Sequence, residues 1–243
     1  MGKSERRGWG EIASSERALN ASGAHDDVVF NDALVDPIAK LRQQRFDQCQ
    51  FANSGDSSGG IDLVRATRAV ADLLDALGVH RESESLTDTP ARVARAYGEL
   101  LTPAPFEATT FPNDEGYDEL VLARDIPFSS LCEHHLLPFT GVAHVGYLPG
   151  KRLLGLSKLA RVVTYYSRRL QVQERLTKQV AGWLVAELNP KGVGVVLEAE
   201  HACMSIRGVR AAGAQTVTSA LVGLVRDDQR TRSEFMALVG RHV

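Results

Sequence analysis

The sequence predicts an α+β fold, in which antiparallel strand pairs are combined with a helical N-terminal part and two long helices. Three features of the chain favour this class. Apolar residues recur at helical spacing from residue 61 onwards, β-branched residues alternate with others in two later stretches, and two long helical patterns separate those stretches. With 243 residues, of which 44% are hydrophobic and 24% charged, the chain has the length and composition of a globular protein with a sizeable core.

The first 60 residues are expected to form a disordered extension. They are rich in Gly, Ser, Asp, Asn and Gln, show no sustained periodicity and end in a Ser/Gly-rich run over 53–60. A short helix over 36–46 would carry no chemistry. The folded domain is therefore expected to span 61–243, with a helical start to about residue 102 and a strand-rich part from about residue 118.

Two helices are expected at the start of this domain. Residues 63–77 repeat apolar side chains at helical spacing, and Gly78 follows as a stop signal. The second helix is expected to open with Thr89 as its N-cap and Pro90 at its first position, where the missing proline N–H costs nothing. Both helices carry an apolar face that must be buried.

Strands are expected on both sides of the segment that carries most of the candidate chemistry. Residues 119–126 have the pattern of a strand that leads into this segment. Residues 139–148 alternate in the same way after it. Pro149-Gly150 marks a turn, so residues 152–155 are expected in the returning strand.

The second half of the chain alternates between helical and extended patterns. Helices are expected from Ser157, as N-cap, and over about 172–188. The run 193–206 is β-branched and alternating, and 215–225 is its turn-separated partner. Residues 231–234 have the form of a capping box ahead of a last helix.

Charge and hydropathy exclude several classes of protein. The 28 basic and 30 acidic residues leave a net charge of -2, which gives no global case for binding nucleic acid or an anionic membrane. No stretch approaches the roughly 18 apolar residues of a membrane span, and the first residues lack the apolar core of a signal peptide. The chain is therefore expected in the cytoplasm, whose reducing conditions agree with cysteines that bind a metal.

The segments Cys132-Glu133-His134-His135 and His201-Ala202-Cys203 together offer two thiols and three imidazoles. Zinc prefers four tetrahedral ligands, and a catalytic site leaves one position to water or substrate. The chain has three cysteines, so a four-cysteine structural site is excluded. Positions i and i+3 converge in a turn and positions i and i+2 share a strand face, so the spacing permits Cys132, His135 and Cys203 as ligands. His134 and His201 would then lie beside the metal, where imidazole can move protons near neutral pH.

Each of these residues also has a plainer interpretation. A Cys-x-x-His pair by itself favours packing or chance, because a free cysteine commonly behaves as a small buried hydrophobe. A single histidine such as His201 is more often hydrogen-bonded in a core than bound to a metal. The repetition of His and Cys in a second segment favours the metal site.

Two pairs of cations differ in what they indicate. Lys158 and Arg161 lie in the first turns of the helix expected from Ser157, where cations oppose the helix dipole unless an anion is bound nearby. This local conflict indicates an anion site. Arg92 and Arg95, three residues apart on a helix, are by themselves most simply a solvated basic face.

Four segments occur together and in the order found in one known family: Cys132–His135, Gly155–Arg161, Gln171–Thr177 and His201–Val209. In these segments the chain resembles GTP cyclohydrolase I, and the resemblance covers roughly residue 61 to the C-terminus. It implies the tunnelling fold (T-fold), an antiparallel sheet with helices packed on one side, whose barrel is completed by oligomerisation. It further implies a homodecamer with active sites at subunit interfaces.

The resemblance also implies a role for each candidate site residue. Zinc is expected on Cys132, His135 and Cys203, and proton transfer on His134, His201 and Ser157. The expected substrate-binding residues are Glu174 with Gln173 for guanine, and Ser157, Lys158, Arg161, Arg207, Arg92 and Arg95 for the triphosphate. The family commonly has proline where Leu170 stands and often lysine where Arg95 stands. Neither departure removes a functional group, although arginine changes the shape of a phosphate contact.

The implied reaction converts GTP and water to formate and 7,8-dihydroneopterin triphosphate, the first step of pterin and tetrahydrofolate biosynthesis. Zinc can lower the pKa of bound water to about 7, which supplies a nucleophile for C8 of guanine. Glu174 can accept hydrogen bonds from N1–H and the exocyclic amine of guanine, a pair of donors that adenine lacks. Considered without the family, Glu174 is a solvated carboxylate on a helix face.

Three other functions are alternatives to this reaction. A non-catalytic oligomeric nucleotide-binding protein could keep the same scaffold, but it would have no use for His134 and His201 beside an open zinc. A paralogue could feed deazapurine biosynthesis through the same first step. A nucleobase deaminase is disfavoured because its His-x-Glu and Pro-Cys-x-x-Cys signature is absent.

Overall fold

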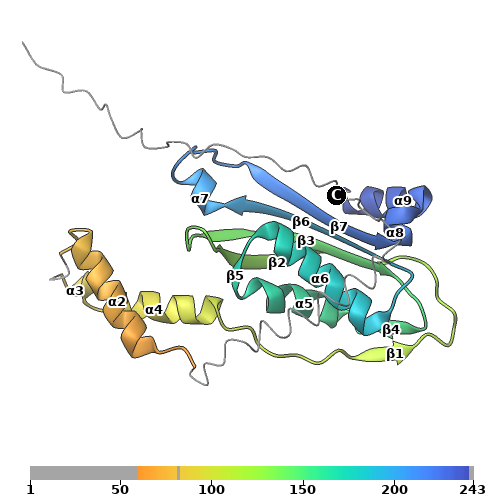
Figure 1. Ribbon diagram of the computed structural model, residues 1–243, viewed down its shortest axis with the longest axis horizontal. Helices are drawn as coiled ribbons and strands as arrows, with labels where there is room; N and C mark the ends of the chain where they lie inside the picture. The colour runs from red at the N-terminus through yellow and green to blue at the C-terminus, as the bar shows by residue number, and fades with distance from the viewer. Residues whose placement is uncertain (1–59, 81–82, 241–243) are drawn as a thin grey trace, which may run out of the picture. The chain divides into compact units, whose positions relative to one another are not determined.

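A five-stranded sheet organises the computed structural model, which describes residues 60–80 and 83–240 (Figure 1). In spatial order, its strands are β5 (Leu170–Gln171), β2 (Val121–Cys132), β3 (Pro138–Leu148), β6 (Gly192–His201) and β7 (Gln215–Gly223). All neighbours are antiparallel except β5, which runs parallel to β2. Apart from Gly60, the extension expected over residues 1–60 lies outside the described residues, as does the helix expected over 36–46.

The register of the strands brings together the two segments that carry cysteine and histidine. β2 and β3 pair so that Leu131 lies opposite Pro138, and β3 pairs with β6 so that Phe139 lies opposite His201. β5 lies beside the end of β2. The end of β2, the start of β3 and the end of β6 therefore meet at one end of the sheet.

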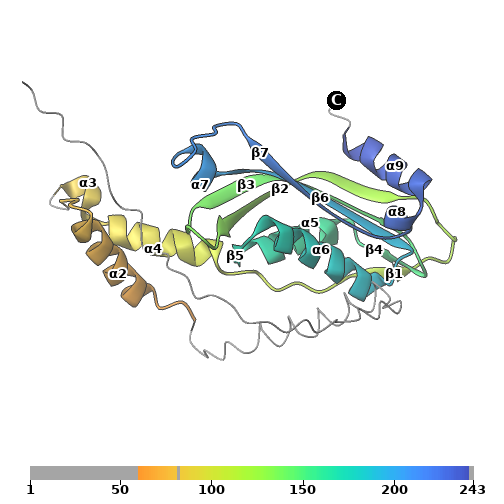
Figure 2. The ribbon, with the colours of Figure 1, turned by 45° about the horizontal axis from the view of Figure 1, so that its top comes forward.

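The helices α5 (Ser157–Ser167) and α6 (Gln173–Leu188) lie along one face of the sheet and form the main core with it (Figure 2). Both helices confirm the expected helical patterns. The residues of this core with no exposed surface include Val193, Val195 and Leu197 from β6 and Leu176, Val180 and Leu184 from α6. Each buried aliphatic side chain contributes roughly 1.5–3 kcal/mol, so this contact fixes α6 firmly on the sheet.

The helix α9 (Gln229–Val239) packs on the opposite face of the sheet, after the short helix α8 (Leu224–Asp227) (Figure 2). The ring of Phe235 covers Gly194, where an added Cβ would lie 2.7 Å from a ring carbon. Val196 belongs to the same buried cluster. The expectation that helices pack on one side only is therefore wrong for α9, because this part of β6 needs apolar cover on both faces.

The N-terminal part forms the helices α2 (Leu63–Ala76), α3 (Glu84–Thr87) and α4 (Thr89–Leu100). The apolar face that was expected to be buried on α2 is partly exposed in the single chain, with Leu63 at 41% and Leu73 at 56% exposure. No helix within residues 60–80 and 83–240 combines the length and apolar character needed to cross a membrane.

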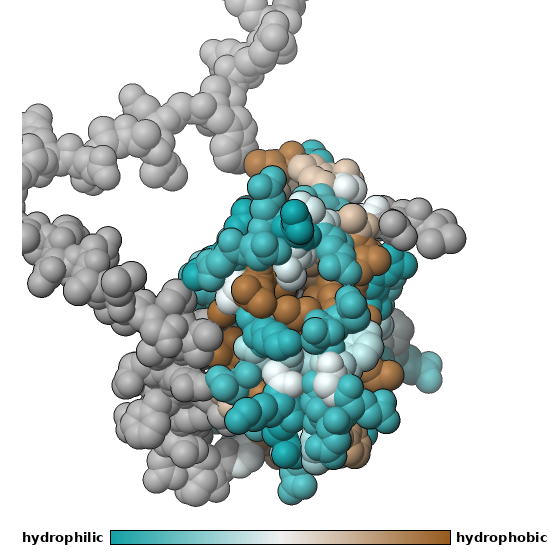
Figure 3. All heavy atoms as spheres, turned by 90° about the vertical axis from the view of Figure 1, so that its right-hand side faces the viewer, coloured by the Kyte–Doolittle hydropathy of each residue, from teal (hydrophilic) through white to brown (hydrophobic). Residues whose placement is uncertain are grey.

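A separate two-stranded sheet is formed by β1 (Thr110–Pro112) and β4 (Arg152–Leu154). Residues 152–154 form a strand, as expected for 152–155, but this strand does not return beside β3, because β2 and β6 already occupy both edges of β3. Figure 3 looks at the end of the protein that carries these strands, where apolar patches interrupt a hydrophilic surface. Phe111 on β1 is 52% exposed.

Three expected helix caps differ from the structure. Asp88 rather than Thr89 occupies the N-cap position of α4, and Ser157 is the first residue of α5 without a side-chain capping bond. Asp228 caps α9, because its carboxylate accepts hydrogen bonds from the N–H and the hydroxyl of Thr231, both at 2.8 Å. The expected capping box that starts at Thr231 is therefore wrong by one turn.

We predict that Phe235→Ala lowers the free energy of unfolding by about 3–5 kcal/mol, because it empties the space over Gly194. Met236→Ala is the matched control: Met236 is 45% exposed, so its replacement should change stability by less than about 0.5 kcal/mol. Chemical denaturation followed by circular dichroism measures both variants. Equal losses in the two would contradict the packing of α9 on the sheet.

Candidate metal centre

Three side chains converge at the end of the sheet in a geometry that suits one zinc ion. Cys132 ends β2, His135 follows in the next turn, and Cys203 lies on the short helix α7 (Ala202–Ser205). One ligand atom from each of the three lies within 4.8 Å of the other two. The Cys132 Sγ and His135 Nδ1 atoms are 3.7 Å apart. Tetrahedral zinc with bonds of about 2.0–2.3 Å separates its ligand atoms by roughly 3.5–3.8 Å, so these residues fit the ion.

A tight turn between β2 and β3 sets the position of His135. The N–H groups of His135 and Leu136 both donate to the carbonyl of Cys132, at 3.3 and 2.9 Å, and Cys132 N–H donates to the carbonyl of Leu137 at 2.9 Å. Leu136 adopts a φ of 55°, in the left-handed region, which reverses the chain. The expected convergence of positions i and i+3 in a turn is confirmed by this geometry.

Cys203 reaches the centre by a different route from the one that the sequence predicts. His201 and Cys203 were expected to share a strand face, but β6 ends at His201 and residues 202–205 form α7. Ile206 N–H donates to the carbonyl of Ala202 at 3.2 Å, which closes this helical turn. The helix therefore turns Cys203 back toward Cys132, while His201 keeps its place on the sheet.

The Cys203 thiol favours its protonated form until a cation is bound. Burial raises the pKa of the Cys203 thiol, and the neighbouring Cys132 thiol raises it further, while the charge of Arg207 opposes both. Zinc binds the thiolate form, so binding of the ion releases protons and its affinity increases with pH. A divalent cation between the sulfurs removes the repulsion that raises this pKa.

The turn that carries the ligands is attached to α6 by Glu133 and Arg175. The guanidinium of Arg175 donates to the Glu133 carboxylate, to the carbonyl of Leu170 at 3.0 Å and to Gln171 Oε1 at 2.9 Å. Glu133 N–H also donates to the carbonyl of Gln171 at 3.0 Å. The hydrogen bond from Arg175 lowers the pKa of Glu133 and keeps this link charged. Neither residue could be identified as part of the site from the sequence, because their pairing depends on β5 lying beside β2.

His134 and His201 lie beside the ligand group in different environments. His134 is exposed, and its Nδ1 is 3.7 Å from Cys132 Sγ. His201 is half-buried, and its ring stacks on Phe139 with centroids 4.5 Å apart and an interplanar angle of 1°. Burial lowers the pKa of His201, while the charge of Glu174 raises it, so His201 is mainly neutral at neutral pH.

The first turn of α6 places Gln173 and Glu174 near His201. Glu174 is exposed, and its charge acts on His201. Gln173 is 1% exposed, and its side chain contacts His201 at 2.8 Å instead of facing solvent. Arg207 follows α7 and is exposed. Glu174 and Arg207 therefore lie at the same end of the sheet as the ligand group.

The remaining candidate residues lie elsewhere in the single chain. Ser157, Lys158 and Arg161 occupy the first turns of α5, which ends at Ser167 just before β5 and the ligand end of the sheet. The 11 residues of α5 place Ser157 about 15 Å from Ser167. Figure 1 shows β4, which precedes α5, at the opposite end of the sheet from α7.

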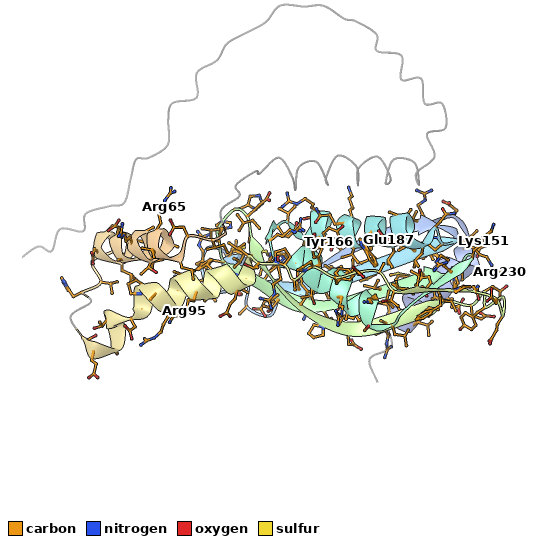
Figure 4. All side chains as sticks on the ribbon, turned by 90° about the horizontal axis from the view of Figure 1, so that it is seen from below. Arg65, Arg95, Lys151, Tyr166, Glu187 and Arg230 are labelled. Carbon is orange, nitrogen blue, oxygen red and sulfur yellow. The ribbon has the colours of Figure 1, made fainter. Side chains whose placement is uncertain are left out.

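Arg92 and Arg95 lie on the exposed surface of α4. Arg92 donates to the Asp88 carboxylate and to the carbonyl of Ser85, both at 3.3 Å. Arg95 projects from the outer side of the same helix (Figure 4). The structure therefore divides the candidate cations into three groups: Arg207 near the ligands, Lys158 and Arg161 on α5, and Arg92 and Arg95 on α4.

Comparison with known proteins gives one consistent result. The model of the family described as GTP cyclohydrolase I matches residues 66–240. The GTP cyclohydrolase 1 of Mycolicibacterium gilvum is 53% identical over 185 residues, which cover 74% of this chain and 92% of the relative. That of Streptomyces avermitilis is 54% identical over 186 residues, with 74% and 92% covered. That of Thermoanaerobacter pseudethanolicus is 50% identical over 184 residues, with 74% and 97% covered.

We predict that Cys132→Ser and Cys203→Ser each lower the affinity for zinc by more than about 100-fold, because loss of an outer-shell partner alone costs about 10–100-fold. Cys49→Ser is the matched control and should bind zinc like the unchanged chain. Competition with a chromophoric chelator measures the affinities. Tight zinc binding by Cys203→Ser would show that the ligand set is wrong.

Proposed function

The chain belongs to the GTP cyclohydrolase I family and has its T-fold, and on this premise we propose that it converts GTP and water to formate and 7,8-dihydroneopterin triphosphate. The observation that carries the proposal is the convergence of Cys132, His135 and Cys203 next to His201 and Glu174. The reaction is the first step of tetrahydrofolate biosynthesis. The thiol ligands of the proposed metal centre agree with a reducing compartment such as the cytoplasm.

We propose that Cys132, His135 and Cys203 hold one zinc ion. Zinc held there would lower the pKa of a bound water molecule to about 7, so that hydroxide is available at neutral pH to attack a purine carbon. Two thiolates and one neutral imidazole balance the charge of the ion. The centre therefore does not attract the triphosphate, and binding of that group depends on the arginine and lysine side chains.

The proton transfers are assigned to the two histidines that are not ligands. Water adds at C8 of guanine, and the ring opens to a formamide whose hydrolysis releases formate. A proton must reach a ring nitrogen when its bond to C8 breaks, and neutral His201 can accept a proton and return it. His134, exposed on the metal-site turn, assists. Ser157 is proposed to shuttle a proton in the later rearrangement of the ribose and closure of the pterin ring.

Guanine recognition is assigned to Glu174. Its exposed carboxylate lies at the start of α6, near His201, and can accept from N1–H and the exocyclic amine together. Adenine offers no such pair of donors, so the desolvated carboxylate would be left without partners. GTP is thereby preferred over ATP.

The triphosphate is proposed to lie between copies of the chain. It carries roughly four negative charges, which suit Lys158, Arg161 and Arg207, with Arg92 and Arg95. Lys158 and Arg161 lie in the first turns of α5, about 14 and 9 Å along the helix from its end at Ser167, so the α5 cations of one chain are set back from its own metal centre. A neighbouring copy supplies them, so the active site is shared.

The proposed assembly is a homodecamer whose sheets join into a barrel. β7 is the last strand of the five-stranded sheet, so one of its edges has no partner within the described chain. Pairing with a second copy removes such an edge. The exposed apolar residues of α2 give the assembly further surface to bury.

We predict that the zinc-loaded protein releases one formate for each pterin formed from GTP and gives no formate from ATP. Oxidation of the product yields a fluorescent pterin, and formate dehydrogenase measures the formate. The Cys203→Ser variant is the control without a complete metal site. A folded, zinc-loaded protein that binds GTP and leaves it unchanged would instead be a non-catalytic nucleotide-binding protein.

A second experiment tests whether the active site is shared. We predict that Cys203→Ser and Lys158→Ala are each nearly inactive alone, and that assemblies formed from equal amounts of both regain up to about a quarter of normal activity. That fraction of sites would combine an intact metal centre from one chain with an intact α5 from another. Mixed assemblies are made by co-expression with two different tags. Sites confined to one chain would show no recovery.

A further inference from the structure

The side chain of Gln173 is held in one orientation by two backbone carbonyls. Its Nε2 donates to the carbonyl of Leu197 at 3.1 Å and to the carbonyl of Thr216 at 2.9 Å. An amide nitrogen has two hydrogens, and both are used here. The reversed orientation would place the amide oxygen against two carbonyl oxygens, which would repel it. The Oε1 atom therefore faces the opposite way.

This orientation decides which nitrogen of His201 carries a hydrogen. Gln173 Oε1 lies 2.8 Å from His201 Nε2. An amide oxygen only accepts hydrogen bonds, so His201 Nε2 must donate. A neutral imidazole carries one N–H, so the lone pair of the ring is on Nδ1.

The surroundings also restrict rotation of the His201 ring. Phe139, opposite His201 on β3, stacks flat against it with centroids 4.5 Å apart. Gln173 is itself buried, at 1% exposure, so its hydrogen bonds do not compete with bulk water. The hydroxyl of Thr177 donates to the carbonyl of Gln173 and lies 2.7 Å from the hydroxyl of Thr218, which ties this turn of α6 to β7.

We propose that Gln173 is a positioning residue that fixes the Nε2–H tautomer of His201 and leaves Nδ1 as the atom that handles the proton. This role rests on the proposed function and differs from the contact with guanine that the resemblance implies for Gln173. In the reaction, the attacking water forms its bond to C8 and gives a proton to His201 Nδ1. Nδ1 returns this proton to the ring nitrogen whose bond to C8 breaks. Nε2 keeps its hydrogen bond to Gln173 throughout.

The tautomer is measured directly by nitrogen NMR of the zinc-loaded, full-length protein labelled with 15N-histidine, at mildly alkaline pH. Solid-state magic-angle spinning makes the measurement independent of particle size. The His201 signals are assigned by their loss in His201→Gln. We expect the hydrogen on Nε2 in the unchanged chain. A hydrogen on Nδ1 would overturn the proposal, whatever any variant does.

Replacing Gln173 separates positioning from binding. Gln173→Met has similar volume but neither donates to the two carbonyls nor accepts from His201. We predict a mixture of His201 tautomers and a kcat at least about tenfold lower, since positioned proton transfer contributes about 10²–10⁴-fold. The KM for GTP and the zinc content should be unchanged, because neither guanine nor the metal touches this side chain.

Gln179→Met is the matched control on the same helix. It removes a part-buried hydrogen bond, from Gln171 at 2.7 Å, without touching His201. In this variant the His201 tautomer, the kcat and the KM for GTP should equal those of the unchanged chain. Normal kcat in Gln173→Met, or a rise in KM with kcat preserved, would overturn the positioning role and favour contact with guanine. If the unchanged chain releases no formate, the proposed function fails, while the His201 spectrum still decides the tautomer.

Discussion

The backbone register between β3 and β6 is the constraint on which the site depends. Phe139 lies opposite His201, and the two strands approach so closely near this end that a Cβ on Gly141 would lie 1.8 Å from the carbonyl oxygen of Glu198. A slip of one residue would turn His201 to the other face of the sheet, away from α6 and Gln173. Close pairing at Gly141 opposes such a slip, so a glycine with no chemical group of its own protects the geometry of the centre.

The helix α6 is the second part of this frame, and its contacts differ in strength. Its buried leucines and valines fix the helix on the sheet, whereas the ion pair between Arg175 and Glu133 is partly exposed and screened by solvent. The core contacts therefore determine where α6 lies, and the ion pair only orients the ligand turn. Gln173 uses the same fixed helix to hold His201. One helix thus aligns both the ligand turn and His201.

Much of the candidate site can be predicted from residue types and short spacings, but the pairing of distant segments cannot be read from the sequence. The convergence of Cys132 and His135 could be predicted because a turn joins positions i and i+3. The helix that carries Cys203 could not be predicted, because the alternating pattern of residues 193–206 continues past His201, whereas the strand ends where β3 begins. The burial of Gln173 was missed for a similar reason. Nothing near it in the sequence indicates that the carbonyls of Leu197 and Thr216 lie within reach.

The division of the charged residues explains why assembly and chemistry would be linked. A centre of two thiolates, an imidazole and a divalent ion is close to neutral, so it gives a polyanion no electrostatic reason to bind. The cations that would attract the triphosphate lie on α4 and in the first turns of α5, at the end of that helix away from the metal centre. A monomer would therefore hold the metal without the phosphate site. Exposed apolar residues on α2 and an edge of β7 that pairs with none of the described residues favour association, so in the proposed assembly the forces that join the chains also complete the active site.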